Sequence, residues 1–162
     1  MIKKAVYAGT FDPFTLGHLN IVERSAKLFD ELIVGVATSE RKTPLFPIAK
    51  RCEMAAHALA HLPNVRVLEL TGLTVEFAQQ QGASCLVRGI RSVTDYDYES
   101  SVAEVNWQLS QGAMETIFVP THAEFACVSS SVVRELILIQ AFDALERFLP
   151  KAVLLEVLNR GS

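Results

Sequence analysis

The sequence lacks several features that mark specialised classes of protein. None of its apolar stretches approaches the roughly 20 residues that a membrane-spanning helix needs. It has only three cysteines, Cys52, Cys85 and Cys127, which are widely spaced and form no C-x-x-C pair. An odd, scattered set favours reduced structural thiols over a disulfide framework. The first residues run directly into a strand pattern without the apolar segment of a signal peptide, so we expect a cytoplasmic protein with no membrane association.

The chain also lacks an excess of basic residues. Its 15 lysines and arginines are outnumbered by 18 acidic residues, and the formal net charge is -3. A general nucleic-acid binder needs a basic surface, so we expect no nucleic-acid partner. A small anionic ligand remains compatible, because a local cluster of basic residues acts within an acidic protein. Half of the residues are hydrophobic and a fifth are charged, which is typical of a soluble globular domain.

Strand and helix patterns alternate along the chain. Short apolar runs predict five strands, at 4–9, 32–38, 65–70, 84–87 and 116–119. Stripes of helical period predict helices at 17–29, 48–61, 75–81 and 95–111, a helix opened by residues 129–131, and a last one from Pro150. This alternation predicts an α/β fold with a doubly wound five-stranded parallel sheet and helices on both faces. With no repeat or linker in the chain, we predict one domain over residues 1–162.

Ligands of such sheets bind beyond the carboxyl ends of the strands, and unusual residues follow the first predicted strand. Gly9-Thr10 ends that strand, and Gly17-His18 opens the helix after it. A helix N-terminus favours an anion, glycine allows close approach, and histidine donates a hydrogen bond to a phosphate oxygen. The segment is neither a P-loop nor a dinucleotide fingerprint. The alternative is a glycine-containing turn with a surface histidine.

A second polar segment, Arg88-Gly89-Ile90-Arg91, follows the fourth predicted strand. Two arginines around a glycine are suited to holding phosphate oxygens by paired N–H groups. The alternative is that they neutralise the acids in the helix opening at 95–99 (DYDYE). The two interpretations are compatible, because those acids could fix the arginines or contact a ligand.

The third segment is the run of serines at 129–131, with Arg134 one turn into the helix. One serine would be an ordinary N-cap, whereas three supply hydroxyl and N–H groups for a polyphosphate. Lys42, in the polar loop after the second strand, is either solvated or part of an anion site. His57 and His61 are four residues apart on a helix, but no third metal ligand accompanies them, and they read as surface or packing residues. We expect Trp107 in the core.

Together these segments resemble the nucleotidyltransferase superfamily, whose T/H-x-G-H signature corresponds to Thr15-Leu16-Gly17-His18. The stretch 7–18 (YAGTFDPFTLGH), the arginine segment with DYDYE and the serine run are similar, in the same order over nearly the whole chain, to the bacterial phosphopantetheine adenylyltransferase family. Related nicotinate or nicotinamide mononucleotide adenylyltransferases and cytidylyltransferases usually carry histidine at the position of Thr15. The chain departs from the family pattern at Ala8 (often proline) and Leu16 (often asparagine), and residues 121–128 are one residue longer than expected.

The resemblance implies a Rossmann-like nucleotidyltransferase fold and the transfer of adenylyl from ATP to 4'-phosphopantetheine, with Mg²⁺, giving dephospho-coenzyme A and pyrophosphate. It implies that Thr10, Lys42 and Arg88 bind the phosphate of phosphopantetheine, that Thr74 contacts its arm, and that His18 stabilises the transition state. It assigns the following residues to ATP: Thr10, Phe11, His18, Gly89, Ile90, Arg91, Glu99, Phe125, Ala126, Cys127, Val128, Ser129, Ser130 and Ser131. Mg²⁺ is expected on the substrate phosphates rather than on side chains. The family is commonly hexameric, so a homohexamer is expected, and coenzyme A is a candidate feedback inhibitor.

The implied chemistry agrees with what the sequence lacks. The attacking group is the acceptor's own phosphate, whose second pKa of about 6 leaves it mostly ionised at neutral pH. In-line attack on the α-phosphorus then requires orientation and charge stabilisation but no general base. The sequence accordingly offers no Ser–His–Asp set and no paired-carboxylate site. Two alternatives stay open: nucleotidyl transfer to another phosphomonoester, and a non-catalytic nucleotide-binding module, which would need neither His18 nor a second anion pocket at Lys42 and Arg88.

Overall fold

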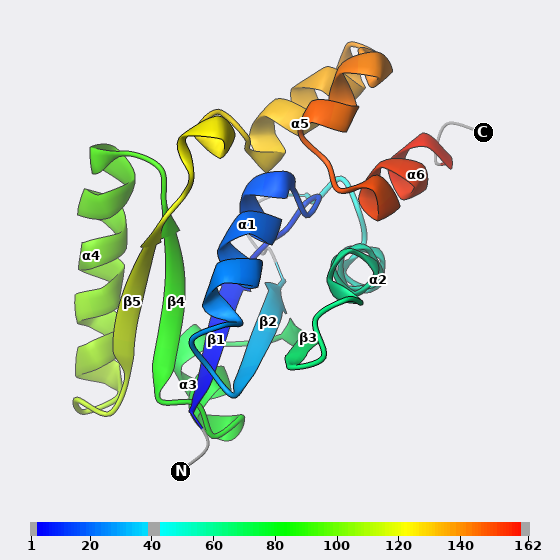
Figure 1. The fold of residues 1–162 in the computed structure, drawn as a ribbon. Helices are drawn as coiled ribbons and strands as arrows, with labels where there is room; N and C mark the ends of the chain where they lie inside the picture. Colours follow the sequence, from blue (N-terminus) through cyan, green and yellow to red (C-terminus); the bar gives the residue numbers. More distant parts are fainter. Residues whose placement is uncertain (1–2, 39–42, 160–162) are drawn as a thin grey trace.

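The computed structural model describes residues 3–38 and 43–159, and one parallel sheet organises them. The strands lie in the order β3-β2-β1-β4-β5 (Figure 1). Their bounds are Lys4–Gly9 (β1), Glu31–Ala37 (β2), Val65–Leu70 (β3), Cys85–Ile90 (β4) and Glu115–Pro120 (β5). The strand order reverses between β1 and β4, as it does in doubly wound sheets. The predicted fold class is confirmed.

Helices cover both faces of the sheet. Helices α1 (Leu16–Ser25) and α2 (Ile48–Leu59) pack on one face, and α3 (Thr74–Gln80) and α4 (Val93–Leu109) pack on the other. Two later helices, α5 (Ser130–Leu138) and α6 (Lys151–Asn159), are preceded by the 3-10 turns η1 (Ala123–Phe125) and η2 (Phe142–Arg147). Figure 1 shows α5 beyond the carboxyl ends of the strands, next to the start of α1.

The two faces follow from alternation along the strands. On β1, Ala5 and Tyr7 pack into the core under α1 and α2, whereas Val6 and Ala8 face the core under α3. Strand β2, between β1 and β3, is apolar on both faces, since Leu32 and Val34 join the first core and Ile33 joins the second. A strand buried on both faces reads as a continuous apolar run, and this is why the sequence identifies β1 and β2 well.

Two predicted element boundaries were clearly wrong. Strand β4 does not end at residue 87 but continues through Ile90, because Arg88, Gly89 and Ile90 pair with Phe118, Val119 and Pro120 of β5. Helix α1 ends at Ser25 rather than near residue 29, and residues 26–28 form a turn.

Trp107 was also placed wrongly in the core. It is 47 % exposed on α4, a helix with no buried residue. Its indole covers Gly112, where a Cβ would lie 3.3 Å from the ring. Helix α4 also leaves other large apolar side chains exposed, among them Val93, Tyr98 and Leu109.

The described residues contain no helix that is both long enough and apolar enough to cross a lipid bilayer.

Candidate functional site

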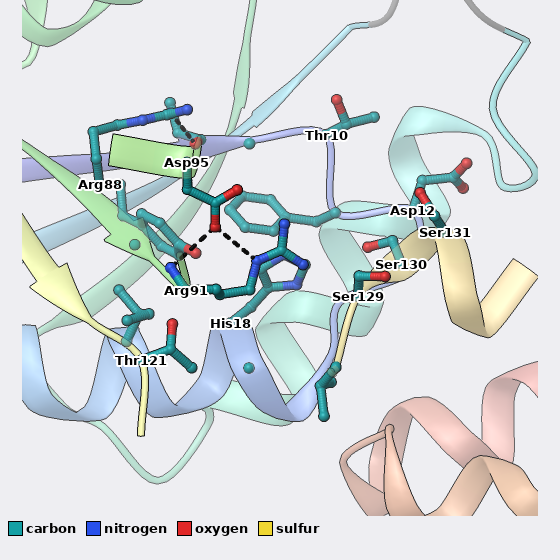
Figure 2. Close-up of a pocket in the computed structure, with 18 of the residues that line it drawn as sticks. Thr10, Asp12, His18, Arg88, Arg91, Asp95, Thr121, Ser129, Ser130 and Ser131 are labelled. Carbon is teal, nitrogen blue, oxygen red and sulfur yellow. Dashed lines mark hydrogen bonds and ion pairs between the residues drawn. The ribbon is translucent and has the colours of Figure 1, made fainter. Parts of the chain in front are cut away.

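A cavity of about 330 Å³ opens at the carboxyl edge of the sheet, where β1 and β4 lie side by side; we call it the main pocket. Its walls are the end of β1 with the turn after it, the start of α1, the end of β4, the first turns of α4 and the start of α5. Figure 2 shows His18 between Arg91 and the three serines, with Thr10 on the wall opposite Thr121. The structure thus brings all three polar segments of the sequence to one site.

His18 is held by the residue that caps its own helix. The Thr15 side chain accepts a hydrogen bond from the His18 N–H, and the Thr15 N–H donates to Nδ1 of His18 at 3.0 Å. A backbone N–H is always a donor, so Nδ1 must be the acceptor, and the proton of the neutral ring resides on Nε2. Nε2 has no partner among the described residues. It is therefore a free donor on a side chain that lines the main pocket.

The surroundings of His18 keep the ring neutral. It lies against the rings of Phe11 and Phe14, with centroids 4.9 and 5.4 Å away. Burial, and secondarily the positive charge of Arg91, lowers the pKa of His18 to about 3. The imidazole is therefore uncharged at neutral pH and offers its Nε2–H group as a hydrogen-bond donor.

Arg88 is oriented by Glu99. Its Nε and Nη2 donate to the two carboxylate oxygens at 2.6 and 2.7 Å, and Nη1 donates to the carbonyl of Ala8 at 2.9 Å. Burial acts to lower the pKa of Arg88, but the pair with Glu99 outweighs it and raises that pKa. A bidentate pair fixes the plane of the guanidinium and leaves one N–H on each terminal nitrogen for an incoming anion.

Arg91 is fixed in a similar way by Asp95, which lies one turn away at the start of α4. The Asp95 carboxylate accepts from the side chain of Arg91 at 3.1 Å and from its backbone N–H at 3.0 Å (Figure 2). Two acids of the DYDYE segment, Asp95 and Glu99, therefore fix the arginines, which is one of the two interpretations that the sequence left open. Asp95 and Glu99 balance the two arginines, so the pocket wall offers oriented donors rather than excess charge.

The serine hydroxyls are already used within the protein. Ser129 caps α5 by accepting from the N–H of Val132, Ser130 donates to the carbonyl of Pro13 at 2.8 Å, and Ser131 accepts from Arg134. The N–H groups of Ser130 and Ser131 have no acceptor among the described residues. This end of α5 therefore presents mainly its backbone N–H groups to the pocket, as an anion-binding helix terminus does.

Asp12 is buried and serves the fold. Its two carboxylate oxygens accept from the N–H groups of Leu45 and Phe46 at 2.8 and 2.9 Å. Its carbonyl accepts from Arg134 at 2.7 Å. Asp12 thereby joins the turn after β1 to the segment that leads into α2, and its carboxylate is not free for a ligand.

A second hollow of about 240 Å³, the side pocket, adjoins the main pocket across Arg88 and Ala8, which line both. Its walls come from β1, β4, the start of α3 and the second half of α4. They are mostly apolar and include Leu73, Val102 and Val105, with Thr74 among them. The charged guanidinium of Arg88 thus separates a polar cavity from an apolar one.

The structure brings most of the predicted site residues together. The main pocket is lined by Thr10, Phe11, His18, Arg88, Gly89, Arg91, Glu99, Val128, Ser129, Ser130 and Ser131, and Thr74 lines the side pocket. Ile90, Phe125, Ala126 and Cys127 line neither; the last three lie in and after η1. Lys42 lies outside the described residues.

Some pocket residues were not identified from the sequence. Tyr7 and Ile21 looked like ordinary core residues, and Asp12 like a turn residue. Thr121 carries a recognisable signal, because it directly follows β5 at the same sheet edge. The predicted surface or packing role of His57 and His61 agrees with their surroundings: His61 pairs with Glu23, and His57 lies beside Glu156, whose carboxylate also pairs with Lys50. His57, Glu53 and Glu156 are close enough to share a cation, but the Lys50 ammonium already pairs with both carboxylates.

Comparisons with known proteins agree with this geometry. Residues 6–136 match the family model described as Cytidylyltransferase-like. The chain is 50 % identical over 133 residues to the phosphopantetheine adenylyltransferase of Symbiobacterium thermophilum, covering 82 % of each protein. It is 42 % identical over 159 residues to that of Actinobacillus succinogenes, covering 98 % of this chain and 96 % of the relative.

A solved structure shares the fold at low sequence identity. The putative nicotinate-nucleotide adenylyltransferase of Vibrio parahaemolyticus superposes with a TM-score of 0.72 at 17 % identity, covering 99 % of this chain and 94 % of that one. At this identity, the likeness concerns the fold alone. The family match and the relatives at 42–50 % identity carry the assignment: the chain belongs to the phosphopantetheine adenylyltransferase family of nucleotidyltransferases.

Proposed function

We propose that this protein transfers the adenylyl group of ATP to 4'-phosphopantetheine, forming dephospho-coenzyme A and pyrophosphate. The observation that carries the proposal is the position of Arg88 between the main pocket and the apolar side pocket. An acceptor that suits both has an anionic group at one end and a long, weakly polar arm at the other. Phosphopantetheine has this form: its phosphate would meet Arg88 and Thr10, and its arm would lie along Leu73 and Thr74. Lys42 is expected to contribute to the same phosphate.

ATP would occupy the main pocket. The N-termini of α1 and α5 both open into it. Arg91 supplies donors for the phosphates, and so do N–H groups that have no acceptor in the part of the chain that the structure describes. Gly17 and Gly89 line the pocket without side chains, which leaves room for the nucleoside. In the segment 125–131, the geometry supports Val128–Ser131 more strongly than Phe125–Cys127, because only the former line the cavity.

The residues favour attack by the acceptor phosphate without a protein base. The phosphate dianion is the nucleophile, since its second pKa is about 6. It forms a bond to the α-phosphorus while the bond to the β-phosphate oxygen breaks, and pyrophosphate leaves with the electron pair. Arg88 orients the attacking phosphate, and Nε2–H of His18 donates to the phosphoryl oxygens as charge develops there. A neutral donor suits this task, because it stabilises charge without a proton being transferred.

The pocket also fits a Mg²⁺ ion that is held by phosphate oxygens and water. Each of its carboxylates is engaged: Asp12 with two backbone N–H groups, Asp95 with Arg91, and Glu99 with Arg88. The ion, when bound, would neutralise charge on the polyphosphate. The Thr10 hydroxyl lines the pocket and has no partner among the described residues, so it is available to a phosphate or to a metal-bound water.

Assembly and regulation extend the proposal. A homohexamer is supported by apolar side chains that one chain leaves open, such as Leu138 and Ile139 at the end of α5, which are 75 % and 68 % exposed. Coenzyme A shares the adenylyl group and the pantetheine arm of the product, so we expect it to compete for both pockets as a feedback inhibitor. We expect the enzyme to act in the cytoplasm.

A panel assay tests the proposal. Pyrophosphate release is measured with ATP or CTP, each offered with phosphopantetheine, nicotinamide mononucleotide or glycerol 3-phosphate. The proposal expects rapid release only with ATP and phosphopantetheine. Faster release with another pair would assign a different transfer reaction, and absence of release with every acceptor would favour a nucleotide-binding module.

A further inference from the structure

A buried arginine lies behind the wall of the main pocket. Arg51, on α2, is 2 % exposed and is among the largest fully buried side chains of the described residues. Its guanidinium lies within 4 Å of no carboxylate in that part of the chain. Burying a charge without a partner of opposite charge is costly. Other groups must therefore stabilise the guanidinium in place of a carboxylate.

Three carbonyl oxygens surround this guanidinium. Nε donates to the carbonyl of Phe46 at 3.0 Å, and Nη1 donates to those of Thr10 at 2.5 Å and Ala37 at 2.8 Å. Thr10 follows β1, Ala37 ends β2, and Phe46 lies just before α2. A single side chain therefore ties the carboxyl ends of two neighbouring strands to the start of a helix.

The turn that Arg51 holds has an unusual backbone. Phe11 has a φ of +48°, a conformation that is unfavourable for a residue with a side chain and persists only where its surroundings impose it. The carbonyls around it are each anchored from outside: Thr10 by Arg51, Asp12 by Arg134 and Pro13 by Ser130. Of these three anchors, only Arg51 lies outside the main pocket.

The anchor on Thr10 determines where the next N–H group points. The Thr10–Phe11 peptide bond is trans, so its C=O and N–H point in opposite directions. Its carbonyl is turned toward Arg51, which does not line the main pocket, whereas Thr10 and Phe11 do. The Phe11 N–H is therefore turned toward the cavity, and it has no acceptor among the described residues. Free N–H groups at a residue of positive φ are typical ligands of anions.

We propose that Arg51 is a positioning residue for the transfer step: it pins the Thr10 carbonyl so that the Phe11 N–H is held as a phosphate donor. This inference rests on the proposed function, since it concerns the phosphates that the main pocket binds. Arg51 acts only through the backbone and does not touch the substrate. Its contribution is greatest when charge develops on the transferred group, so its loss lowers kcat more than it raises KM for ATP.

Two substitutions and a matched control test the proposal. Arg51→Lys keeps the charge but offers a single nitrogen in place of a fork that reaches three carbonyls, and Arg51→Met keeps the length of the side chain without donors. The control is Lys50→Met on the same helix, an exposed residue that pairs with Glu53 and Glu156. We expect kcat per folded enzyme to fall at least tenfold in the lysine variant and roughly 10²–10³-fold in the methionine variant. Lys50→Met stays within about twofold.

A second readout observes the donor itself. In a ¹⁵N-labelled protein, inorganic pyrophosphate is titrated while the Phe11 amide resonance is followed. In the wild-type protein and in Lys50→Met, we expect a saturable downfield shift, and in Arg51→Lys a much smaller one at saturation. This readout does not depend on the acceptor, so it separates the two hypotheses. If the wild-type protein transfers nothing but the Phe11 shift depends on Arg51, the positioning role stands and the proposed function fails.

Three outcomes would overturn the positioning role. One is a Phe11 amide in the wild-type protein that does not respond to pyrophosphate. Another is an Arg51→Lys variant with the kcat and the Phe11 shift of the wild type. The third is a loss of activity that follows only the unfolded fraction, with normal kcat per folded molecule, because this would assign Arg51 to stability alone. If Arg51→Met does not fold, the lysine variant and the wild-type titration decide the question.

Discussion

Replacement of His18 gives the sharpest test of how charge is stabilised in the proposed reaction. Glutamine and glutamate have nearly the same shape, and both are natural partners in a capping box, where the side chain accepts from the N-cap N–H. Each can therefore replace Nδ1 of His18 as the acceptor for the Thr15 N–H, which lies 3.0 Å away in the structure. Only glutamine also carries an N–H group that can replace Nε2–H.

The expected magnitudes separate the two roles of the residue. His18→Ala removes the donor and should lower kcat by roughly 10²–10³, equivalent to about 3–4 kcal/mol. It also removes a cap contact and should cost about 1 kcal/mol of unfolding free energy. His18→Gln should recover most of that stability and part of the rate. His18→Glu should recover the stability but remain at or below the rate of the alanine variant, because a carboxylate repels the phosphates.

The assay is steady-state pyrophosphate release at saturating substrates, paired with urea denaturation of each variant and repeated from pH 5 to 8. With a pKa of about 3, His18 is neutral across this range, so it contributes no titration to kcat. A fall in rate toward low pH, near a pKa of about 6, should come from the acceptor phosphate and should persist in His18→Gln. Equal rates for the Gln and Glu variants, or an acid limb that disappears in His18→Gln, would refute the reasoning.

Three further substitutions test other parts of the site. Arg88→Lys loses the bidentate pair with Glu99, so steady-state kinetics should show a KM for phosphopantetheine raised at least tenfold and a KM for ATP raised much less. Equal increases in the two KM values would contradict the assignment. Gly89→Ala puts a Cβ 3.1 Å from Ile21, so we expect thermal unfolding to show a free energy of unfolding lower by about 1–2 kcal/mol. The KM for ATP should also rise, and unchanged ATP binding would count against the site. Asp12→Asn should lower the free energy of unfolding, measured by urea denaturation, by about 2 kcal/mol, because one backbone N–H loses its acceptor. The Mg²⁺ concentration that gives half-maximal activity should not change in this variant. A large increase in that concentration would identify Asp12 as a metal ligand.

Much of the fold could be predicted because its sheet is buried on both faces. The runs at β1 and β2 are apolar on consecutive residues, and the glycines and polar residues that end them coincide with the sheet edge. The reversal of strand order then brings segments that are distant in sequence to one place. For this reason Gly17-His18, Arg88 and the serine run could be assigned to one site before the structure was known.

The details that the sequence did not predict depend on three-dimensional contacts. The pairing of β4 with β5 extends the strand through Ile90, although Arg88 and Gly89 look like the start of a loop. The serine hydroxyls point to partners within the protein, a choice that their sequence spacing leaves open.

Arg51 did carry a signal in the sequence. It lies at helical spacing with Met54, Ala55 and Ala58 on the buried face of α2, and a charged residue on such a stripe marks a specific internal partner.

The central claim is that the phosphate of phosphopantetheine attacks the α-phosphorus of ATP. It is tested most directly with phosphopantetheine whose non-bridging phosphate oxygens are ¹⁸O, followed by mass spectrometry of both products. We predict that all of the label is found in dephospho-coenzyme A, including the new bridging oxygen, and that pyrophosphate contains none. Label in pyrophosphate, or a product that carries two phosphates from ATP, would contradict the account.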